Sequence, residues 1–240
     1  MTNFRVLYKI LYMTLEEGRE FSINGKIFEE EVANIINTKS PKEYYDKIKN
    51  VLNLNGAEKA TADRKTIGRL KSGGNPKTDV IADNKTISCK KTSCKFVSAH
   101  EYDYKKFVEV LDPNNKRLEE LLKEFQRVGG VRAFGKNNEK ELTEVLKPYK
   151  RKLIEWVLSG YAGDIKNQNQ LAKFIITTDE KDIYAHTVED YIDILMKEEN
   201  EAQFGTPFSW TYPSKRKGEK IQLKVKVIKW LTFVFNCNKI

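Results

Sequence analysis

Three side chains in one short stretch have the types and the spacing that phosphodiester chemistry requires. Asp79 ends a turn, and Ser88 and Lys90 lie in the strand-like run Ile87–Lys91. Alternate residues of a strand point to the same face, so Ser88 and Lys90 share one face and the rest of the run lies on the other. The turn at Asp83-Asn84 predicts a hairpin that brings Asp79 and Lys90 to one cleft.

An acid and a lysine in one cleft suit the hydrolysis of phosphodiesters. Carboxylate oxygens bind hard cations such as Mg²⁺, which polarise a phosphoryl oxygen and acidify water. An ammonium beside the phosphate stabilises the negative charge that develops there. We therefore interpret Asp79 as a metal ligand and Lys90 as an electrostatic stabiliser that also orients or activates the attacking water. Such pairs are common in strands without any activity, so the spacing alone is a weak signal.

The pattern around this stretch places helices before and after it and short strands within it. If Ile87 and Cys89 pack into the core, Ser88 and Lys90 face the open side. Period-2 alternation covers residues 64–98, and Pro148 predicts a kink or a second start within one long helix. The predicted helices cover 2–17, 25–37, the segment after Pro41, 103–111, 114–127, 139–159 and 188–199. The predicted strands cover 171–179 and 182–188, with a β-rich part at 204–235.

These elements predict an α/β fold in which a central mixed β-sheet is flanked by helices. No internal repeat or low-complexity linker divides the 240 residues, so we expect a single domain over residues 1–240. Its expected parts are a helical part at 1–63, core strands at 64–112, a helical and β part at 113–200 and a β-rich basic part at 201–240.

Composition indicates a polyanionic partner and a reducing compartment. The net charge of +9 favours binding to nucleic acid, although a lysine-rich proteome would also produce it. The three cysteines form no CxxC pair, which argues against a disulfide framework and predicts a cytoplasmic protein. No apolar run approaches the ~20 residues that a membrane-spanning helix needs, so we expect no membrane partner.

Basic residues concentrate near the C-terminus. Residues 215–229 contain seven basic residues and one acid. In a strand, Gln222 and Lys224 share a face, and both side-chain types can read base edges. Lysines on an edge strand also protect it against aggregation, which is the alternative interpretation. Three residues of the preceding loop are predicted phosphate contacts: Lys215, Arg216 and Lys217.

Several segments resemble one family of nucleases. GGNPKTDV at 73–80, followed by ISCKKTSCKFVSAHEYD at 87–103, is similar to the active-site segment of MspI-type type II restriction endonucleases, members of the PD-(D/E)xK superfamily. Further similar segments follow the family's order: GKIFE at 25–29, LKPYKRKLIEWVL at 146–158, FGTPFSWTY at 204–212 and KIQLK at 220–224. The resemblance implies a restriction-endonuclease-like core and one endonuclease domain.

The resemblance also implies an activity and a catalytic set. It implies magnesium-dependent double-strand cleavage of DNA at a short palindrome, with CCGG as the expected site. Asp79 matches the metal-binding aspartate and Lys90 the motif lysine. Ser88 departs from the pattern, because the superfamily usually has an acid there and this branch has asparagine. Glu29 matches a helical glutamate near the family's active site and can supply a second metal ligand. The alternative for Glu29 is a solvated acidic face in the run Glu29–Glu31.

The family's base-contacting positions are also matched. The resemblance implies that four residues read bases in double-stranded DNA: Ser98, Thr211, Gln222 and Lys224. It implies no nucleotide cofactor and either a monomer or a homodimer. Two alternatives stay open: a catalytically silent DNA-binding protein, motivated by the Ser88 departure, and a nuclease of the same fold that acts on other DNA structures.

Overall fold

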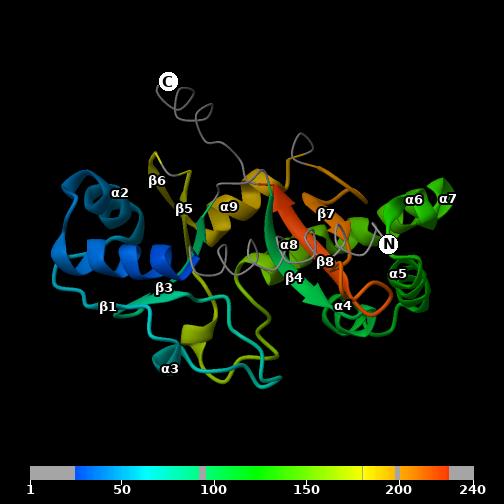
Figure 1. Cartoon of the computed structure of the whole chain (residues 1–240), viewed down its shortest axis with the longest axis horizontal. Coiled ribbons are helices and arrows are strands. Elements are labelled where there is room, and N and C mark those ends of the chain that lie inside the picture. The colour runs from blue at the N-terminus through cyan, green and yellow to red at the C-terminus, as the bar shows by residue number, and fades with distance from the viewer. Residues whose placement is uncertain (1–24, 92–95, 180, 198–200, 227–240) are drawn as a thin grey trace, which may run out of the picture. The chain divides into compact units, whose positions relative to one another are not determined.

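The chain forms two compact units, each built around its own β-sheet. A computed structural model describes residues 25–91, 96–179, 181–197 and 201–226 (Figure 1). The first unit contains the described residues up to Lys91 together with Ala162–Val188, and the second contains the other described residues. The predicted helix at 2–17 lies outside the described residues. That residues 1–240 act as one endonuclease domain stays a prediction.

The first unit contains a five-stranded mixed sheet in the order β1-β2-β3-β5-β6. β3 and β5 are parallel, whereas the other neighbouring strands are antiparallel. The predicted hairpin joins β2 to β3, and Asp83 in its turn has a φ of 51°. The expected mixed sheet flanked by helices is therefore confirmed. The strands are β1 (Ala60–Thr61), β2 (Val80–Ala82), β3 (Lys85–Lys91), β5 (Phe174–Thr178) and β6 (Ile183–Thr187).

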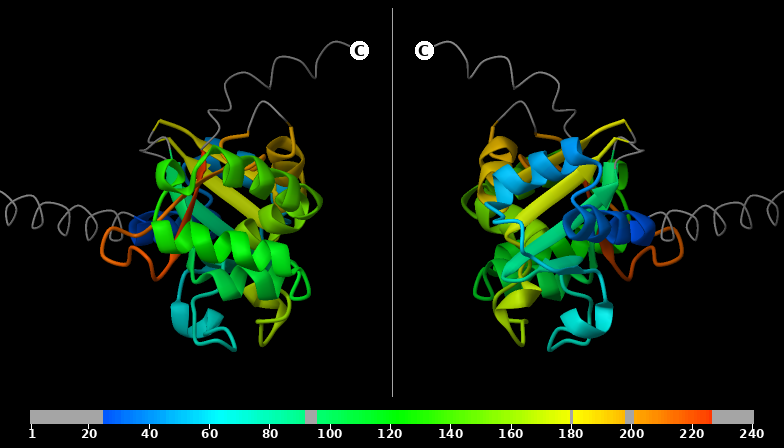
Figure 2. Two further views of the ribbon diagram at one scale, coloured as in Figure 1. Left: turned by 90° about the vertical axis from the view of Figure 1, so that its right-hand side faces the viewer. Right: turned by 90° about the vertical axis from the view of Figure 1, so that its left-hand side faces the viewer.

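Two helices cover one face of this sheet. The helix at 25–38 and α2 (Lys42–Leu52) lie over the strands, as the blue helices in Figure 2 show. Each fully buried aliphatic or aromatic side chain contributes roughly 1.5–3 kcal/mol to folding. Ile87 and Cys89, which strand alternation placed on one face, both lie in this core. The core also contains Phe28, Val32, Ile35, Ile36, Ile48, Leu52, Val80, Ile176 and Ile183.

A short helix interrupts the segment that was predicted to alternate as strand. α3 (Arg64–Ile67) replaces the expected extended chain at the start of 64–98. Its formation follows from local chemistry, because the Asp63 side chain accepts a hydrogen bond from the Lys65 amide at 2.9 Å and caps the helix. Gly68, with φ of 77°, ends it. The expectation of period-2 structure there was wrong because the N-cap outweighs the weak alternation.

The second unit contains a three-stranded antiparallel sheet in the order β4-β8-β7, together with several helices. The predicted long helix is divided at Pro148 into α7, a 3₁₀ turn and α8, so the second start is confirmed. No helix in the described part of the chain is long and apolar enough to cross a membrane. The strands are β4 (Phe96–Tyr102), β7 (Phe208–Thr211) and β8 (Ile221–Lys226). The helices are α4 (Tyr104–Leu111), α5 (Lys116–Val128), α6 (Val131–Phe134), α7 (Lys136–Leu146), α8 (Lys150–Leu158) and α9 (Val188–Leu195).

Aromatic rings form the centre of the second unit. Trp210 is 1% exposed, and its ring centroid lies 5.7 Å from that of Phe107 and 5.6 Å from that of Phe204. Its indole Nε1 donates a hydrogen bond to the Thr206 hydroxyl at 2.8 Å, so the one polar atom of the ring is satisfied. Trp210 is therefore a core residue.

Asn115 joins the start of α5 to a neighbouring turn. Its Oδ1 accepts from the Leu118 amide at 2.9 Å, and its Nδ2 donates to the Tyr149 hydroxyl at 3.2 Å. We expect Asn115→Ala to lower the free energy of unfolding by about 1–2 kcal/mol, since an N-cap is lost. Urea denaturation would measure this. Asn114→Ala, at an exposed position beside it, is the control. Equal midpoints for the two variants would contradict the capping role.

Candidate active site

The β2–β3 hairpin brings Asp79, Ser88 and Lys90 together. The Asp79 amide donates to the Ile87 carbonyl at 2.8 Å, which fixes the aspartate at the entry to β2. Its Oδ2 accepts from the Cys89 amide at 2.9 Å, from the Ser88 hydroxyl at 3.2 Å and from Lys90 Nζ at 3.2 Å. The pairing of Asp79 with Lys90 that the turn predicted is therefore present.

Lys90 is held by acceptors from its own strand. Its Nζ donates to Ser88 Oγ at 2.7 Å and to the Cys89 carbonyl at 3.1 Å, in addition to Asp79. An ammonium has three N–H donors, and here each has an acceptor. This arrangement presents Lys90 as a fixed cation.

Ser88 differs from its expected environment. Its side chain was predicted to face the open side of the strand, but the residue is only 1% exposed. The prediction failed because strand alternation gives the face that a residue occupies and not what covers it. The Ser88 hydroxyl bridges Asp79 and Lys90, so it orients both groups.

Glu29 joins the site through an arginine. Arg64 Nη2 donates to Glu29 Oε1 at 2.7 Å, to Glu29 Oε2 at 2.9 Å and to Asp79 Oδ1 at 3.1 Å. The Glu29 side chain is 13% exposed, whereas Glu30 and Glu31 are exposed. Glu29 is therefore not simply part of a solvated acidic face. We call Glu29, Arg64, Asp79, Ser88 and Lys90 the acid–lysine cluster.

Arg64 was missed by the sequence reasoning. It is the first residue of α3, which the Asp63 cap begins. The preceding chain is tied to the helix at 25–38 by Asn37, whose Nδ2 donates to the Ala60 carbonyl at 2.9 Å and whose Oδ1 accepts from the Ala60 amide at 2.8 Å. Nothing in the sequence separates Arg64 from other surface arginines, since its partners come from distant segments.

The charges of the cluster perturb one another. Burial and the Asp79 carboxylate raise the pKa of Glu29. Burial acts to lower the pKa of Arg64, but the Asp79 and Glu29 carboxylates raise it overall. Burial and the nearby Lys90 charge lower the pKa of Lys77, another residue that sequence reasoning missed, to about 7. Clusters of perturbed titratable groups are typical of functional sites.

The donor set suits one kind of metal ion. Within the described residues, no group of three or more His, Cys, Asp or Glu side chains could hold a metal ion. Mg²⁺ does not require such a group, because it keeps several waters and is commonly bound by one or two carboxylates plus substrate phosphates. Asp79 and Glu29 share the Arg64 cation and provide two hard-oxygen carboxylates. The residues present therefore fit Mg²⁺.

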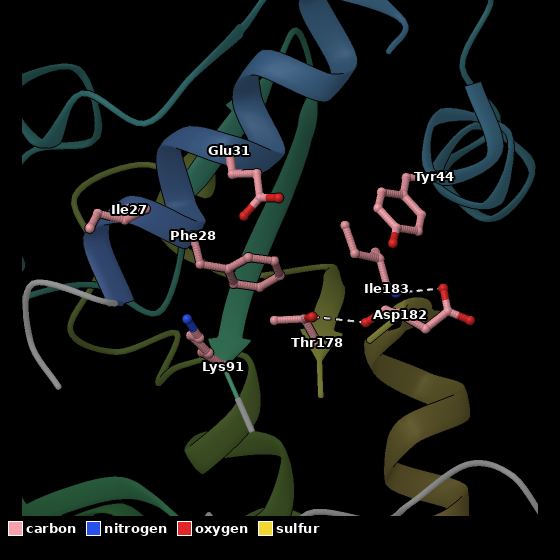
Figure 3. A pocket seen from close by; sticks show the side chains of 8 residues that line it. All are labelled: Ile27, Phe28, Glu31, Tyr44, Lys91, Thr178, Asp182 and Ile183. Atoms are coloured by element: carbon pink, nitrogen blue, oxygen red, sulfur yellow. Dashed lines mark hydrogen bonds between the residues drawn. The ribbon is translucent and has the colours of Figure 1, made fainter. Parts of the chain in front are cut away.

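Lys91 lies on the other side of β3. It lines a pocket of about 360 Å³ beside the helix at 25–38 (Figure 3). Phe28 and Glu31 border the same pocket from the helix, and Asp182 borders it from the loop before β6. Adjacent lysines of one strand thus belong to different environments, and Lys90 is the one that contacts Asp79.

The second unit carries the predicted DNA-reading residues on its three-stranded sheet. In β8, Gln222 and Lys224 are partly exposed, while Ile221, Leu223 and Val225 are buried. Lys224 pairs in backbone register with Ser98 of β4 and with Ser209 of β7. Gln222 pairs with Thr211 and Glu101. The four predicted base-reading positions therefore form two neighbouring rows, which also include Ser209 and Glu101, both missed by the sequence reasoning.

The basic loop between β7 and β8 is anchored to the same unit. Its predicted phosphate-contacting residues, Lys215, Arg216 and Lys217, are exposed. Lys217 Nζ lies 5.4 Å from the centroid of the Tyr212 ring. Gln126 Nε2 of α5 donates to the Gly218 carbonyl at 3.2 Å. These contacts anchor the Lys217 side chain and the backbone of the loop.

Comparison with known proteins defines first a fold and then a family. The fold is that of a restriction endonuclease crystallised with DNA: the crystal structure of MspI in complex with its cognate DNA matches with a TM-score of 0.70, covering 93% of this chain and 99% of that chain at 24% identity. The family model "Restriction endonuclease MspI" matches residues 23–225. The chain belongs to the MspI restriction endonuclease family.

Two curated relatives are similar over much of the chain. The type II restriction enzyme BsuFI of Bacillus subtilis is 37% identical over 196 residues, which cover 76% of this chain and 46% of BsuFI. The type II restriction enzyme MspI of Moraxella sp is 30% identical over 175 residues, which cover 66% of this chain and 67% of MspI. The chain thus spans about half the length of BsuFI and two thirds of MspI.

Proposed function

We propose that this protein is a type II restriction endonuclease that makes magnesium-dependent double-strand cuts in DNA at a short palindrome, with CCGG as the expected sequence. The observation that carries the proposal is the acid–lysine cluster, in a chain of the MspI family. Similar proteins are named type II restriction enzymes, and MspI was crystallised with its cognate DNA. We further propose that it acts as one endonuclease domain in the cytoplasm, as a monomer or homodimer, without a nucleotide cofactor.

The side chains of the acid–lysine cluster have different roles in the proposed reaction. Asp79 and Glu29 would hold Mg²⁺, with water and DNA phosphate oxygens completing its ligands. When bound, Mg²⁺ polarises the scissile phosphoryl group and acidifies water. The Lys90 ammonium stabilises the negative charge that grows on the phosphoryl oxygens as water attacks. Ser88 holds the Lys90 and Asp79 side chains in position through its two hydrogen bonds.

The second unit supplies the DNA contacts in this proposal. The Lys224 ammonium can donate to guanine O6 and N7, and the Gln222 amide can make mixed contacts with base edges. Thr211 and Ser98 occupy the same two cross-strand rows as these residues. Lys215, Arg216 and Lys217 bind phosphates, which gives affinity without sequence information.

Substitutions at the two kinds of DNA contact should have different signatures. We expect Lys224→Ala to weaken binding to a CCGG duplex by about 1–3 kcal/mol and to change binding to a scrambled duplex little. Replacing Lys215, Arg216 and Lys217 together by glutamine should weaken binding to both duplexes. It should also reduce the slope of log K against log salt by roughly 0.9 for each lost phosphate contact. Fluorescence anisotropy in EDTA at several salt concentrations measures both effects. If the two variants changed sequence preference and salt slope alike, the division into base-reading and phosphate-binding residues would be contradicted.

The proposed activity is tested by mapping cuts. Purified protein is incubated with Mg²⁺ and with two plasmids that differ only in the presence of CCGG sites, and the fragment ends are sequenced. We expect double-strand cuts confined to CCGG. DNA that remains unbroken would reject the nuclease, whereas cuts at another sequence would retain the nuclease and reject CCGG.

A catalytically silent DNA-binding protein is the second candidate. The Ser88 departure favours it, because a hydroxyl stands where the superfamily usually has an acid and this branch has asparagine, and it already contacts Asp79 and Lys90. This candidate predicts salt-dependent retention of DNA and intact plasmid in Mg²⁺.

A further inference from the structure

We propose that Arg64 is a displaceable counter-ion, which neutralises Glu29 and Asp79 until DNA binds and thereby makes metal binding depend on DNA. This inference rests on the proposed function, because it concerns the two carboxylates that would hold Mg²⁺. It assigns a regulatory role to a residue outside the acid and lysine motif.

The geometry shows one guanidinium nitrogen in the place of a bridging cation. Arg64 Nη2 lies 2.7 and 2.9 Å from the two oxygens of Glu29 and 3.1 Å from Asp79 Oδ1. Two carboxylates at close range repel each other, and each favours a shared positive charge. Arg64 supplies that charge and keeps both acids assembled.

Arg64 and a metal ion would compete for the same two carboxylates. Mg²⁺ needs carboxylate oxygens at about 2.0–2.1 Å in near-octahedral geometry. The ion and the guanidinium would also repel each other at close range. A metal ion that enters without DNA must therefore compete with Arg64 for Glu29 and Asp79, which weakens metal binding.

Arg64 is placed so that it can leave. Its side chain is 39% exposed, whereas those of Glu29 and Asp79 are 13% and 9% exposed. It is the first residue of a helix of only four residues. Guanidinium groups bind phosphate through two parallel hydrogen bonds, which makes a DNA phosphate a suitable new partner.

Thermodynamic linkage gives this exchange a measurable consequence. If DNA draws Arg64 away from the acids, DNA raises the affinity for the metal, and the metal raises the affinity for DNA by the same factor. Coupling energies of this kind typically correspond to about 5–150-fold changes in affinity. Removing the guanidinium should raise the affinity of the DNA-free protein for metal and reduce the coupling.

The test measures Mn²⁺ binding to the full chain by electron paramagnetic resonance, without DNA. We expect Arg64→Gln to bind Mn²⁺ at least about fivefold more tightly than the unmodified protein. Arg64→Lys keeps the positive charge and should bind Mn²⁺ more weakly than Arg64→Gln. Arg69→Gln is the matched control, because Arg69 is exposed and contacts Asn75 Oδ1 rather than either acid. Thermal melting establishes whether each variant is folded. If Arg64→Gln does not fold, Mn²⁺ binding to Arg64→Lys is compared with that of the unmodified protein instead.

A second measurement adds a duplex with an uncleavable phosphate analogue. DNA should tighten Mn²⁺ binding to the unmodified protein and to Arg69→Gln more than to Arg64→Gln. Without DNA, Mn²⁺ binding to Arg64→Gln that is no tighter than to the unmodified protein would overturn the proposal. Mn²⁺ binding to Arg64→Lys that is as tight as to Arg64→Gln would also overturn it. Plasmid cleavage by the unmodified protein separates this failure from failure of the proposed nuclease activity.

Discussion

Lys90→Met and Asp79→Asn should each reduce the rate of plasmid cleavage by about 100- to 1,000-fold or more, while DNA binding in EDTA stays within about tenfold. In the proposed mechanism, Lys90→Met removes the ammonium that stabilises the developing charge, and Asp79→Asn removes a carboxylate that would hold the metal. Both side chains belong to the acid–lysine cluster, and neither lies on the three-stranded sheet of the second unit. Initial rates on supercoiled plasmid in Mg²⁺ and anisotropy in EDTA measure the two properties separately.

The neighbouring lysine provides the control for this experiment. Lys91 has the same side chain on the same strand but lines the pocket on the other face. We expect Lys91→Met to cleave at close to the rate of the unmodified protein. A large loss in Lys91→Met with normal cleavage by Lys90→Met would reject the assignment of the site. Normal cleavage by Asp79→Asn would reject Asp79 as a metal ligand.

The second large effect concerns stability. We expect Trp210→Ala to lower the free energy of unfolding by about 3–5 kcal/mol, because it removes a fully buried ring and leaves a cavity. The Thr206 hydroxyl also loses the indole donor that it accepts from at 2.8 Å. Urea denaturation followed by circular dichroism measures the change.

Tyr212→Ala is the matched comparison for Trp210→Ala. Tyr212 is partly exposed and lies two residues after Trp210, so its loss should cost less than half as much. Trp210→Phe should give an intermediate value, since it keeps a ring and loses the hydrogen bond. A smaller effect for Trp210→Ala than for Tyr212→Ala would show that the aromatic centre does not dominate the stability of this unit.

Local rules were enough to choose between adjacent side chains. Strand alternation paired Ser88 with Lys90 and excluded Lys91, and the turn at Asp83 predicted the hairpin that brings Asp79 near. Alternation likewise predicted the partly exposed face of β8 that carries Gln222 and Lys224. These rules succeed because the direction of a strand side chain depends only on its position in the strand.

Contacts between distant segments could not be obtained in this way. Arg64 meets Glu29 across 35 positions and Asp79 across 15, and the Asp63 cap that begins its helix gives no sign of either partner. The burial of Ser88 was missed for a related reason, since it depends on what covers the strand. Ser209 and Glu101 share cross-strand rows with the predicted base-reading residues. This could be seen only from the register of the three strands.

The parallel pairing of β3 with β5 has a consequence for the order of synthesis. β3 ends at Lys91, but its neighbour β5 spans Phe174–Thr178. A nascent chain therefore presents Ser88 and Lys90 on a strand with one unpaired edge until more than 80 further residues have been added. Because such long-range pairing forms slowly, the sheet that contains Lys90 becomes complete only late in translation, and fragments ending before β5 should lack the β3–β5 pairing.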